Sequence, residues 1–301
     1  MPLLEGQPGV GEIFIIRSRK SPFWFSPRQR ALAKWLRARA PGPTWFCDPG
    51  PIGRDLLRRG NIPDAYVCED AALPKIPGEH FVDRWIRFAQ TTPPAFADTL
   101  APAPSLVPSA ARLEVSPAAE GVLDRWLANR GLCGRSLILI QAGNKRTMRR
   151  GARQRVTNTK YWPEERWATV IRALNAAQPD HAILLMGVPA EFSLNSDIAA
   201  RADVSSVYNV ADDLPIDVLL PLLQRASSMV SVDTGPAHAA AALECPTVAL
   251  FGTSDPQLYR PGGVTTPAIA LTGEVDGQRS MLGITAAQVI ESWRSIALRA
   301  R

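Results

Sequence analysis

Short apolar runs alternate with helical segments between residues 137 and 251, and this alternation constrains the fold more than any other feature of the sequence. Segments of about 10 to 15 residues with helical periodicity, placed between apolar runs too short to be helices, are typical of βαβ units. We expect strands at 137–140, 182–186, 206–208, 229–232 and 247–251, with helices at 163–177, 189–200, 215–226 and 235–243. Because these strands are apolar along their whole length, a parallel sheet covered by helices on both faces is predicted.

The first half of the chain has a weaker pattern. A strand is expected at 12–17 and helices at 27–39, 52–59 and 80–90. The segment 91–111 holds five of the 27 prolines and is otherwise rich in Ala, Ser and Thr, as expected of a linker. We therefore predict an N-terminal α/β domain at 1–111, which includes the linker 91–111, and a C-terminal domain at 112–301. Roughly 90 residues are few for a doubly wound domain, so the first domain is either reduced or begins partway through.

Composition excludes several classes of protein. The chain is 46% hydrophobic and 21% charged, which is typical of a globular protein rather than a disordered one. No apolar stretch reaches about 18 residues and the first residues do not form a secretory signal, so a cytoplasmic protein is expected. The four cysteines form no C-x-x-C pair and the three histidines are dispersed, so we expect neither a disulfide scaffold nor a metal site, and no cofactor.

Positive charge is concentrated in two segments that contain no acid. Residues 17–39 hold eight basic residues and residues 145–160 hold seven, out of 34 Lys plus Arg against 28 Asp plus Glu. Without these 15, the remaining 19 basic and 28 acidic residues sum to −9, although the whole chain has a net charge of +6. Each segment is therefore a candidate anion-binding site.

The most informative segment reads Val230-Ser-Val-Asp-Thr-Gly-Pro-Ala-His238. It predicts a buried strand that ends at Asp233, a turn through Thr234 and Gly235, and a helix with Pro236 in its first turn. Such a turn directs backbone N–H groups and the positive end of a helix dipole at the ligand crevice, which suits a phosphate or diphosphate. His238, one turn into the helix, adds a donor. In the alternative interpretation Asp233 and Thr234 only cap the helix, and His238 is an ordinary surface or core histidine.

A second segment, Gln141-Ala-Gly-Asn-Lys-Arg-Thr147, leaves the first strand of the α/β domain and is followed by more arginines and by Lys160-Tyr-Trp-Pro. This order places a basic loop at the carboxyl edge of the same sheet as Asp233. A basic loop beside a helix N-terminus is expected to bind a polyanion, and Lys160, next to the ordered helix, is the strongest candidate. The alternative is a solvated basic loop.

Taken together, V-S-V-D-T-G-P-A-H, A-A-A-L-x-x-P-T-V-A-L-F-G-T-S-D-P, Q-x-G-N-K-R-T and K-x-W-P resemble glycosyltransferase family 9, the ADP-heptose:lipopolysaccharide heptosyltransferases. The resemblance covers residues 80–300. It implies the GT-B architecture, two Rossmann-like domains facing across a cleft, here with a short or truncated N-terminal domain on the acceptor side and a C-terminal domain that binds the nucleotide sugar.

The resemblance also implies donor-binding residues. Those expected at the diphosphate and sugar are Lys160, Asp233, Thr234, Gly235, Pro236 and His238, with Gly143, Arg146 and Thr147 beside the phosphates. Gly187, Glu191 and Leu214 are expected to border the nucleoside. The alternative for the last two is a solvated Glu on an exposed helix and a Leu that only packs in a short loop.

The implied chemistry is an inverting transfer of a sugar, a heptose, from a nucleoside-diphosphate donor such as ADP-heptose to a lipopolysaccharide core or lipid-linked acceptor. Lys160 and the Asp233 helix terminus would take up the charge of the leaving diphosphate, so no metal is required in principle. The family's N-terminal Gly-Asp turn, which carries its proposed base, is missing from Ile13-Phe-Ile-Ile-Arg-Ser-Arg. The catalytic base is therefore unknown, and nothing in the sequence supports Asp48, Asp55 or Asp83 in that role. The alternative function is a non-catalytic nucleotide-sugar-binding protein.

The basic segment 17–39 has two interpretations. With Phe23, Trp24, Phe25 and Trp35 it suits an acidic acceptor or an anionic membrane surface, so the protein is expected to contact the inner face of the cytoplasmic membrane peripherally. Alternatively it is a solvated amphipathic helix whose aromatic residues lie in the core. Nucleic acid is not an expected partner, because no nucleic-acid-binding fold accompanies the charge.

Overall fold

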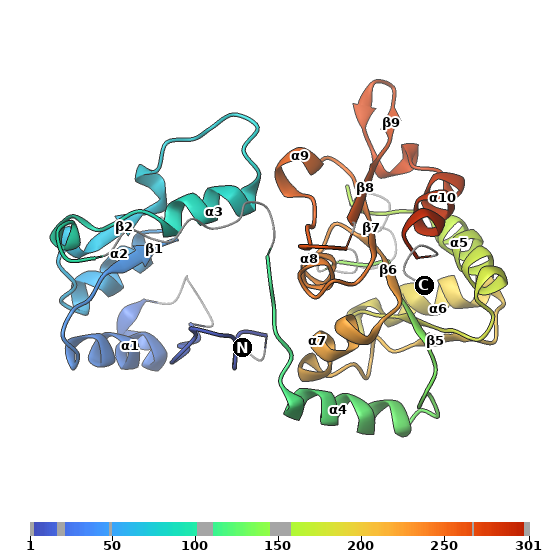
Figure 1. Ribbon diagram of the computed structural model, residues 1–301, viewed down its shortest axis with the longest axis horizontal. Coiled ribbons are helices and arrows are strands. Elements are labelled where there is room, and N and C mark those ends of the chain that lie inside the picture. Colours follow the sequence, from blue (N-terminus) through green and yellow to red (C-terminus); the bar gives the residue numbers. More distant parts are fainter. Residues whose placement is uncertain are drawn as a thin grey trace. The chain divides into compact units, whose positions relative to one another are not determined.

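The computed structural model describes residues 3–16, 22–47, 50–100, 111–144, 158–266 and 268–297. The chain forms two compact units (Figure 1). The first unit comprises Gly9–Pro108, and the second comprises Ser109–Arg301 together with the short segment Pro2–Pro8. That short segment is held to the second unit by Gln7, whose Nε2 donates to the backbone oxygen of Glu114 at 2.8 Å and whose Oε1 accepts from the backbone N–H of Glu114 at 2.9 Å.

The second unit is built on a six-stranded sheet that is parallel throughout, with strand order β5-β4-β3-β6-β7-β8. The strands are β3 (Leu137–Gln141), β4 (Ala182–Leu185), β5 (Val207–Asn209), β6 (Ser228–Val232), β7 (Thr247–Phe251) and β8 (Ala268–Thr272). Numbered within this sheet, the order is 3-2-1-4-5-6, which is that of the Rossmann fold. The chain reverses its direction of winding between the neighbouring strands β3 and β6, and ligands bind outside the carboxyl ends of strands at such a point.

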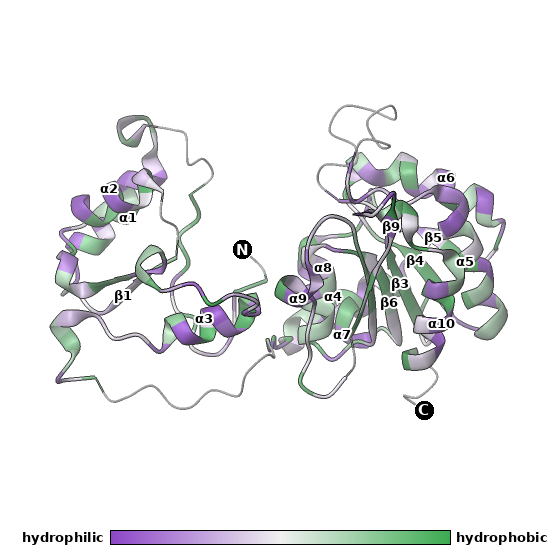
Figure 2. Cartoon of the chain, turned by 90° about the horizontal axis from the view of Figure 1, so that it is seen from above, coloured by the Kyte–Doolittle hydropathy of each residue, from purple (hydrophilic) through white to green (hydrophobic). Residues whose placement is uncertain are grey.

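Helices cover both faces of this sheet because successive strand residues alternate between the faces. Ile138 and Ile140 of β3 belong to one buried cluster, while Leu137 and Leu139 belong to the other. The first cluster is completed by α5 (Glu164–Ala177), α6 (Phe192–Ala202) and α10 (Ala286–Ala297), and the second by α4 (Pro117–Ala128), α7 (Ile216–Arg225) and α8 (Gly235–Ala242). Figure 2 shows apolar residues along the strands and hydrophilic residues on the outer sides of the helices.

Local sequence explains where several of these elements lie. Pro117 occupies the first turn of α4, and the Ser116 hydroxyl caps this helix by accepting from the N–H of Ala119 at 3.2 Å. In α10, the fully buried Trp293 donates from Nε1 to the hydroxyl of Ser228 at 2.8 Å, which ties this helix to the first residue of β6. After β7 come the short helix α9 (Pro256–Tyr259) and the hairpin of β9 (Glu274–Val275) and β10 (Gln278–Arg279).

The first unit has a much smaller sheet. Strands β1 (Thr44–Phe46) and β2 (Val67–Glu69) pair in parallel, and the helices are α1 (Pro27–Arg37), α2 (Pro51–Arg59) and α3 (Phe81–Ala89). Short 3-10 turns η1 (Phe23–Phe25), η2 (Asp64–Tyr66), η3 (Asp70–Ala72) and η4 (Pro94–Phe96) connect them. Among the described residues, the buried apolar side chains of this unit are those of Ala33, Leu56, Ile62 and Phe88.

The predicted parallel sheet is confirmed, and each strand and helix expected between 137 and 251 is present within about two residues of its expected limits. The strand expected at 12–17 is wrong: residues 12–16 are irregular. In the described part of this unit β1 and β2 pair only with each other, so no ladder is available to hold residues 12–16 extended. The sequence interpretation also missed α4, β8 and α10, which contain few long apolar runs. No helix among the described residues is long and apolar enough to span a membrane.

Candidate functional site

The candidate site lies at the carboxyl edge of the large sheet, where the chain leaves several neighbouring strands. Gly143 follows β3, Gly187 follows β4, Asp233 follows β6 and Gly252 follows β7. Since β3 and β6 flank the point at which the winding reverses, Gly143 and Asp233 lie on its two sides.

Asp233 is the centre of a polar group of three residues. Its side chain is largely buried, and Oδ2 accepts from Lys160 Nζ at 2.6 Å while Oδ1 lies 3.5 Å from His238 Nε2. Lys160 Nζ also donates to the backbone oxygen of Asp233 at 2.7 Å. Burial by itself raises the pKa of Asp233, but the hydrogen bonds from His238 and Lys160 outweigh it and lower that pKa below its ordinary value. Asp233 is thus an ionised carboxylate that holds two basic side chains at one edge of the sheet.

The turn after Asp233 leaves the N-terminus of α8 open. Thr234 is the N-cap residue by backbone position, but its side chain makes no capping hydrogen bond and instead lies 3.1 Å from the Ser231 hydroxyl. The interpretation in which Asp233 and Thr234 only cap the helix is therefore wrong, because both side chains are directed elsewhere. A Cβ atom on Gly235 would meet no atom within 4 Å, so there is free space at the first residue of the helix. Pro236 follows in the first turn.

Lys160 reaches Asp233 because its own segment is pressed onto the end of β7. A Cβ atom on Gly252 would lie 2.0 Å from the backbone oxygen of Thr159, so only glycine allows this approach. On the other side, the buried Trp162 donates from Nε1 to the backbone oxygen of Ile284 at 2.9 Å. These two contacts fix the backbone before and after Lys160, and thereby the position from which its side chain extends.

The ends of the basic segment lie together at this edge. Asn158 donates from Nδ2 to Oδ1 of Asn144 at 3.4 Å, and its own Oδ1 accepts from the backbone N–H of Lys160 at 3.0 Å. Asn144 and Asn158, which lie just before and just after residues 145–157, are therefore close together. Arg146 and Thr147, with the other residues of 145–157, lie outside the described residues.

Glu191 occupies a buried position between the ends of β3 and β4. It is 3% exposed, and its Oε2 accepts from the backbone N–H of Val188 at 2.9 Å and from Nε2 of Gln141 at 3.4 Å. Its Oε1 is buried and has no hydrogen-bond partner. Burial raises the pKa of Glu191, and the two donated hydrogen bonds offset that effect only in part. An acceptor of this kind is suited to a hydroxyl group that enters the site.

Both flanking glycines are required by this carboxylate. A Cβ atom on Gly143 would lie 2.4 Å from Glu191 Oε1, and one on Gly187 would lie 2.9 Å from Oε2. The alternative in which Glu191 is a solvated residue on an exposed helix is therefore wrong, because the 3-10 turn before α6 folds its side chain inward. Leu214 is half-buried against the cluster beneath α4 and α7.

Sequence reasoning missed two residues of this edge, Gln141 and Gly252. Both were present in the quoted motifs without a role. Two signals point to them. Gln141 is a polar residue at the end of an otherwise apolar strand, and Gly252 is a glycine directly after another strand.

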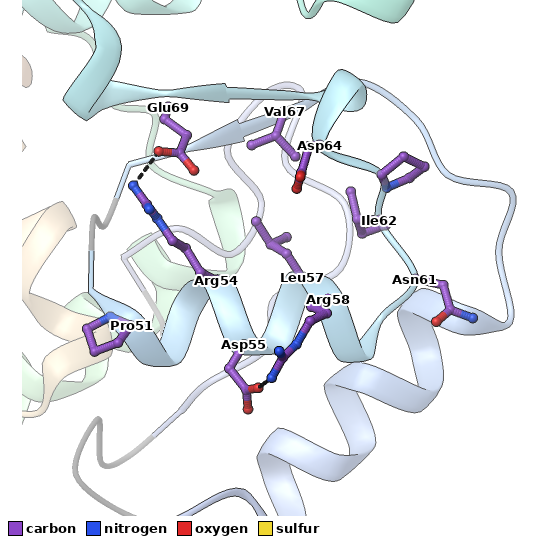
Figure 3. Close-up of a pocket in the computed structure, with 11 residues that line it drawn as sticks. Pro51, Arg54, Asp55, Leu57, Arg58, Asn61, Ile62, Asp64, Val67 and Glu69 are labelled. Atoms are coloured by element: carbon purple, nitrogen blue, oxygen red, sulfur yellow. Dashed lines mark hydrogen bonds and ion pairs between the residues drawn. The ribbon is translucent and has the colours of Figure 1, made fainter.

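The first unit contains a separate hollow of about 1010 Å³ between α2 and β2 (Figure 3). Four of its charged side chains form two ion pairs: Arg54 contacts Glu69 at 2.5 Å and Arg58 contacts Asp55 at 2.6 Å. Hydrogen bonds from Arg59 and Arg58 lower the pKa of Asp55, which is unfavourable for a general base. Asp48 lies outside the described residues. Within the described ranges, no three His, Cys, Asp or Glu side chains are grouped so as to hold a metal ion.

Most of the residues of this edge lie within a match to a known protein family. The model of glycosyltransferase family 9 (heptosyltransferase) matches residues 124–279, which is more than half of the chain and includes Lys160, Asp233 and His238. The chain belongs to glycosyltransferase family 9. The family resemblance predicted from the sequence motifs is thereby confirmed.

Curated relatives match over part of their length. Lipopolysaccharide heptosyltransferase 3 of Escherichia coli is 31% identical over 104 residues, 34% of this chain and 30% of its own. Lipopolysaccharide heptosyltransferase 1 of E. coli strain K12 is 34% identical over 100 residues, 33% of this chain and 30% of its own. With lipopolysaccharide heptosyltransferase 2 of that strain, the identity is 26% over 153 residues, 46% of this chain and 43% of the relative. The matches thus span less than half of these proteins.

Solved structures of the family share the fold. The glycosyl transferase family 9 structure from Veillonella parvula DSM 2008 has a TM-score of 0.69 at 17% identity, covering 90% of this chain and 78% of the other. E. coli ADP-heptose lps heptosyltransferase II has a TM-score of 0.67 at 20% identity, covering 90% and 81%. The predicted fold class, α/β of the GT-B type, is confirmed by this likeness.

Proposed function

We propose that this family 9 chain is a glycosyltransferase of lipopolysaccharide synthesis, which transfers a heptose from a nucleoside-diphosphate donor, ADP-heptose, to a lipopolysaccharide core acceptor with inversion. The observation that carries the proposal is the polar group of Lys160, Asp233 and His238 beside the open N-terminus of α8. A diphosphate placed there would meet a lysine, a histidine and the positive end of a helix dipole.

Asp233 positions the two basic side chains. Lys160 Nζ has three protons and donates to Oδ2 and the backbone oxygen of Asp233, so it can direct another proton at a phosphate oxygen. As the bond between the anomeric carbon and the diphosphate oxygen lengthens, negative charge accumulates on that oxygen. Lys160 and the first turn of α8, through the backbone N–H groups of Thr234 and Gly235, would stabilise this charge without moving, because both are already in place. Pro236 has no N–H to donate and contributes only by fixing the backbone of that turn.

Glu191 is proposed to hold the nucleoside. The unpartnered Oε1 would accept a hydrogen bond from a ribose hydroxyl, and Gly143 and Gly187 leave the space in which the Glu191 carboxylate itself lies. Leu214 would supply an apolar contact for the base. Arg146 and Thr147 are proposed to lie beside the phosphates, on the segment whose ends are joined by Asn144 and Asn158.

A second candidate function is donor binding without transfer. Residues 13–16 are irregular and contain no Gly-Asp turn, and Asp55 is engaged by two arginines. No described acid of the first unit is therefore assigned as the base. In this case the protein would bind a nucleoside diphosphate or nucleotide sugar and release it unchanged.

The acceptor of the first candidate is lipid-linked, so we further propose that the protein works at the inner face of the cytoplasmic membrane through a peripheral contact with anionic lipid. Helices α1 and α2 of the first unit carry more basic than acidic side chains, and this supports the proposal.

Calorimetric titration with ADP tests the donor site. The variant Lys160→Gln keeps a donor near Asp233 but removes the charge, and we expect ADP affinity to fall on the order of tenfold to a hundredfold. Lys75→Ala, which removes an exposed lysine of the first unit, is the control and should bind as the unmodified protein does. Equal affinity of Lys160→Gln and the control would contradict the proposed site.

Turnover then separates the two functions. Purified protein is incubated with ADP-heptose and a heptose-deficient lipopolysaccharide precursor, and released ADP and extended precursor are measured. A glycosyltransferase forms both at equal rates. If ADP binds, and binds more weakly to Lys160→Gln, while neither product appears, the non-catalytic function is the correct one.

A further inference from the structure

The turn η1 (Phe23–Phe25) presents the two most exposed large apolar side chains among the described residues. Trp24 is 68% exposed and Phe25 is 82% exposed, whereas other exposed large apolar residues reach at most 52%. Two neighbouring aromatic side chains in water are unfavourable unless another surface covers them. The proposed chemistry at the donor site does not use them.

The two side chains are exposed although the backbone of the turn is held by hydrogen bonds. The N–H of Phe25 donates to the Pro22 oxygen at 3.1 Å, and the N–H of Ser26 donates to the Phe23 oxygen at the same distance. Directly behind, the Ser26 side chain caps α1, and the guanidinium of Arg59 lies 4.2 Å from the centre of the Phe23 ring. Arg30 donates to the backbone oxygen of Trp24. The Arg59 guanidinium also lies 5.4 Å from the centre of the Trp24 ring. The turn is thus fixed at the N-terminus of α1, while most of the Trp24 and Phe25 side chains remains exposed.

Basic side chains are concentrated on the helix that follows the rings. Helix α1 carries Arg28, Arg30, Lys34 and Arg37 and contains no acid. On the adjacent helix α2, the side chain of Arg58 is 79% exposed. Among the described residues, the acids nearest in sequence to η1 and α1 are Glu12, which is paired with Arg39, and Asp55, which is paired with Arg58 and Arg59. The rings therefore project from a surface that attracts anions.

We propose that η1 and the exposed side of α1 form a membrane-docking surface, in which Trp24 and Phe25 enter the headgroup region of an anionic bilayer while the surrounding basic side chains bind lipid phosphates. Tryptophan is favoured at this depth because its ring is apolar and its N–H can still reach water. Aromatic insertion combined with basic charge is the usual design of peripheral anchors.

The composition of the patch favours lipid over single-stranded nucleic acid. Bases stack on flat rings, but this surface also has exposed aliphatic residues. Ile15 is 42% exposed and its backbone oxygen accepts from Arg28 Nη1, so it belongs to the same side of the unit. Phe14 stacks on Trp35 with ring centres 4.9 Å apart. A mixed aromatic and aliphatic surface rimmed by arginine matches the bilayer interface.

This inference rests on the proposed function in one respect: the lipid-linked acceptor is the reason for the protein to dock at a membrane. Binding to vesicles is measured without donor or acceptor, so a failure of docking and a failure of transfer are distinguishable. The test is flotation of the full chain with vesicles of phosphatidylcholine alone, and with vesicles of one part phosphatidylglycerol to two parts phosphatidylcholine. We expect the protein to float with the anionic vesicles and to be released by high salt.

Three variants and one control identify the surface. Trp24→Ala with Phe25→Ala should lower partitioning to anionic vesicles by about tenfold or more, and Lys34→Glu with Arg37→Glu should lower it to a similar degree. Ile76→Ala removes a 52% exposed apolar residue elsewhere in the first unit and should leave partitioning unchanged. Trp24→Phe should retain binding but lose the blue shift of tryptophan emission that vesicles cause. All of these residues are exposed, so folding should be preserved.

Several results would overturn the proposal. One is equal vesicle binding by the double alanine variant and the unmodified protein. A second is a dimer in solution that this variant converts to a monomer, which would mean that a second copy covers the rings. A third is ring-dependent binding of a single-stranded oligonucleotide without binding to vesicles.

Discussion

The two units of the chain differ most in how they are held together. The second unit has apolar clusters on both faces of a six-stranded sheet, whereas the described residues of the first unit bury four apolar side chains beside a two-stranded one. The first unit relies instead on ion pairs such as Arg84 with Asp70 and Arg87 with Glu79. Such pairs at a surface contribute little to stability, but a packed core fixes atomic positions closely. The contrast explains why the candidate site lies on the second unit, since its chemistry depends on distances.

The largest effect should come from separating the units. We expect a fragment of residues 109–301 to unfold in a single cooperative thermal transition, because it retains both apolar clusters. A fragment of residues 9–108 should show no sharp transition, because two paired strands and few buried side chains are not enough for independent stability. Circular dichroism during heating distinguishes the two. A cooperative transition in the smaller fragment would remove the contrast.

The same substitution in each unit sharpens the comparison. Gly252→Ala places a Cβ atom 2.0 Å from a backbone oxygen in the second unit, while Gly60→Ala places one 2.7 Å from the Leu36 side chain in the first. We expect about 2 to 3 kcal/mol of destabilisation for Gly252→Ala and less for Gly60→Ala, because a half-buried leucine can move whereas this backbone cannot. Denaturant titration measures both.

Gly252→Ala should also weaken ADP binding, since it displaces Thr159 and therefore Lys160. Gly235→Ala is the companion variant: its Cβ atom would meet nothing in the protein, so stability should be unchanged while ADP binding falls. If Gly252→Ala binds ADP normally, the Thr159 contact does not set the position of Lys160.

A pH-dependent contribution is expected at Glu244 of the second unit. Its partial burial raises its pKa, but hydrogen bonds from the Thr265 hydroxyl and the N–H groups of Val264, Thr265 and Thr266 lower it to about 2. Because the folded pKa is lowered, this carboxylate stabilises the protein above its ordinary pKa of 4.5, and the contribution is lost as pH falls toward about 2. Glu244→Gln should cost on the order of 2 kcal/mol at neutral pH and progressively less in acid.

Glutamate 274 supplies the control for this prediction. It lies on the exposed strand β9, so Glu274→Gln should change stability little at any pH. A Glu244→Gln penalty that stays constant between neutral pH and pH about 3 would show that the hydrogen-bonded carboxylate is not the cause.

The smallest effect is expected at Glu191, where stability and binding should change in opposite directions. Its folded pKa is raised, so stability is greater below the ordinary pKa and falls as pH rises through the raised value. At neutral pH, Glu191→Gln removes a buried charge and should stabilise the protein by about 1 kcal/mol. ADP affinity should fall, because a neutral amide is a weaker acceptor for a hydroxyl. A variant that is less stable would contradict the assignment.

The sequence predicted the second unit well because its signals are local. Apolar runs, Pro236 after a turn and the segment ending at Asp233 each specify structure within a few residues. It failed where the outcome depends on distant partners. Residues 12–16 have strand-like composition but no strand to pair with among the described residues. The contact of Gly252 with Thr159 joins residues far apart in the chain, so no local pattern reveals it.

The hydrogen bond between Trp293 and Ser228 has a consequence for biosynthesis. The strand that ends at Asp233 is anchored at its first residue to a helix that the ribosome makes some sixty residues later. Val289, Trp293 and Ile296 of that helix belong to the apolar cluster on one face of the sheet. Until the helix emerges, this face of the central strands stays open to water. We therefore expect prematurely terminated chains to hold the strand that leads to Asp233 less firmly, and the nascent protein to complete its candidate site only at a late stage of translation.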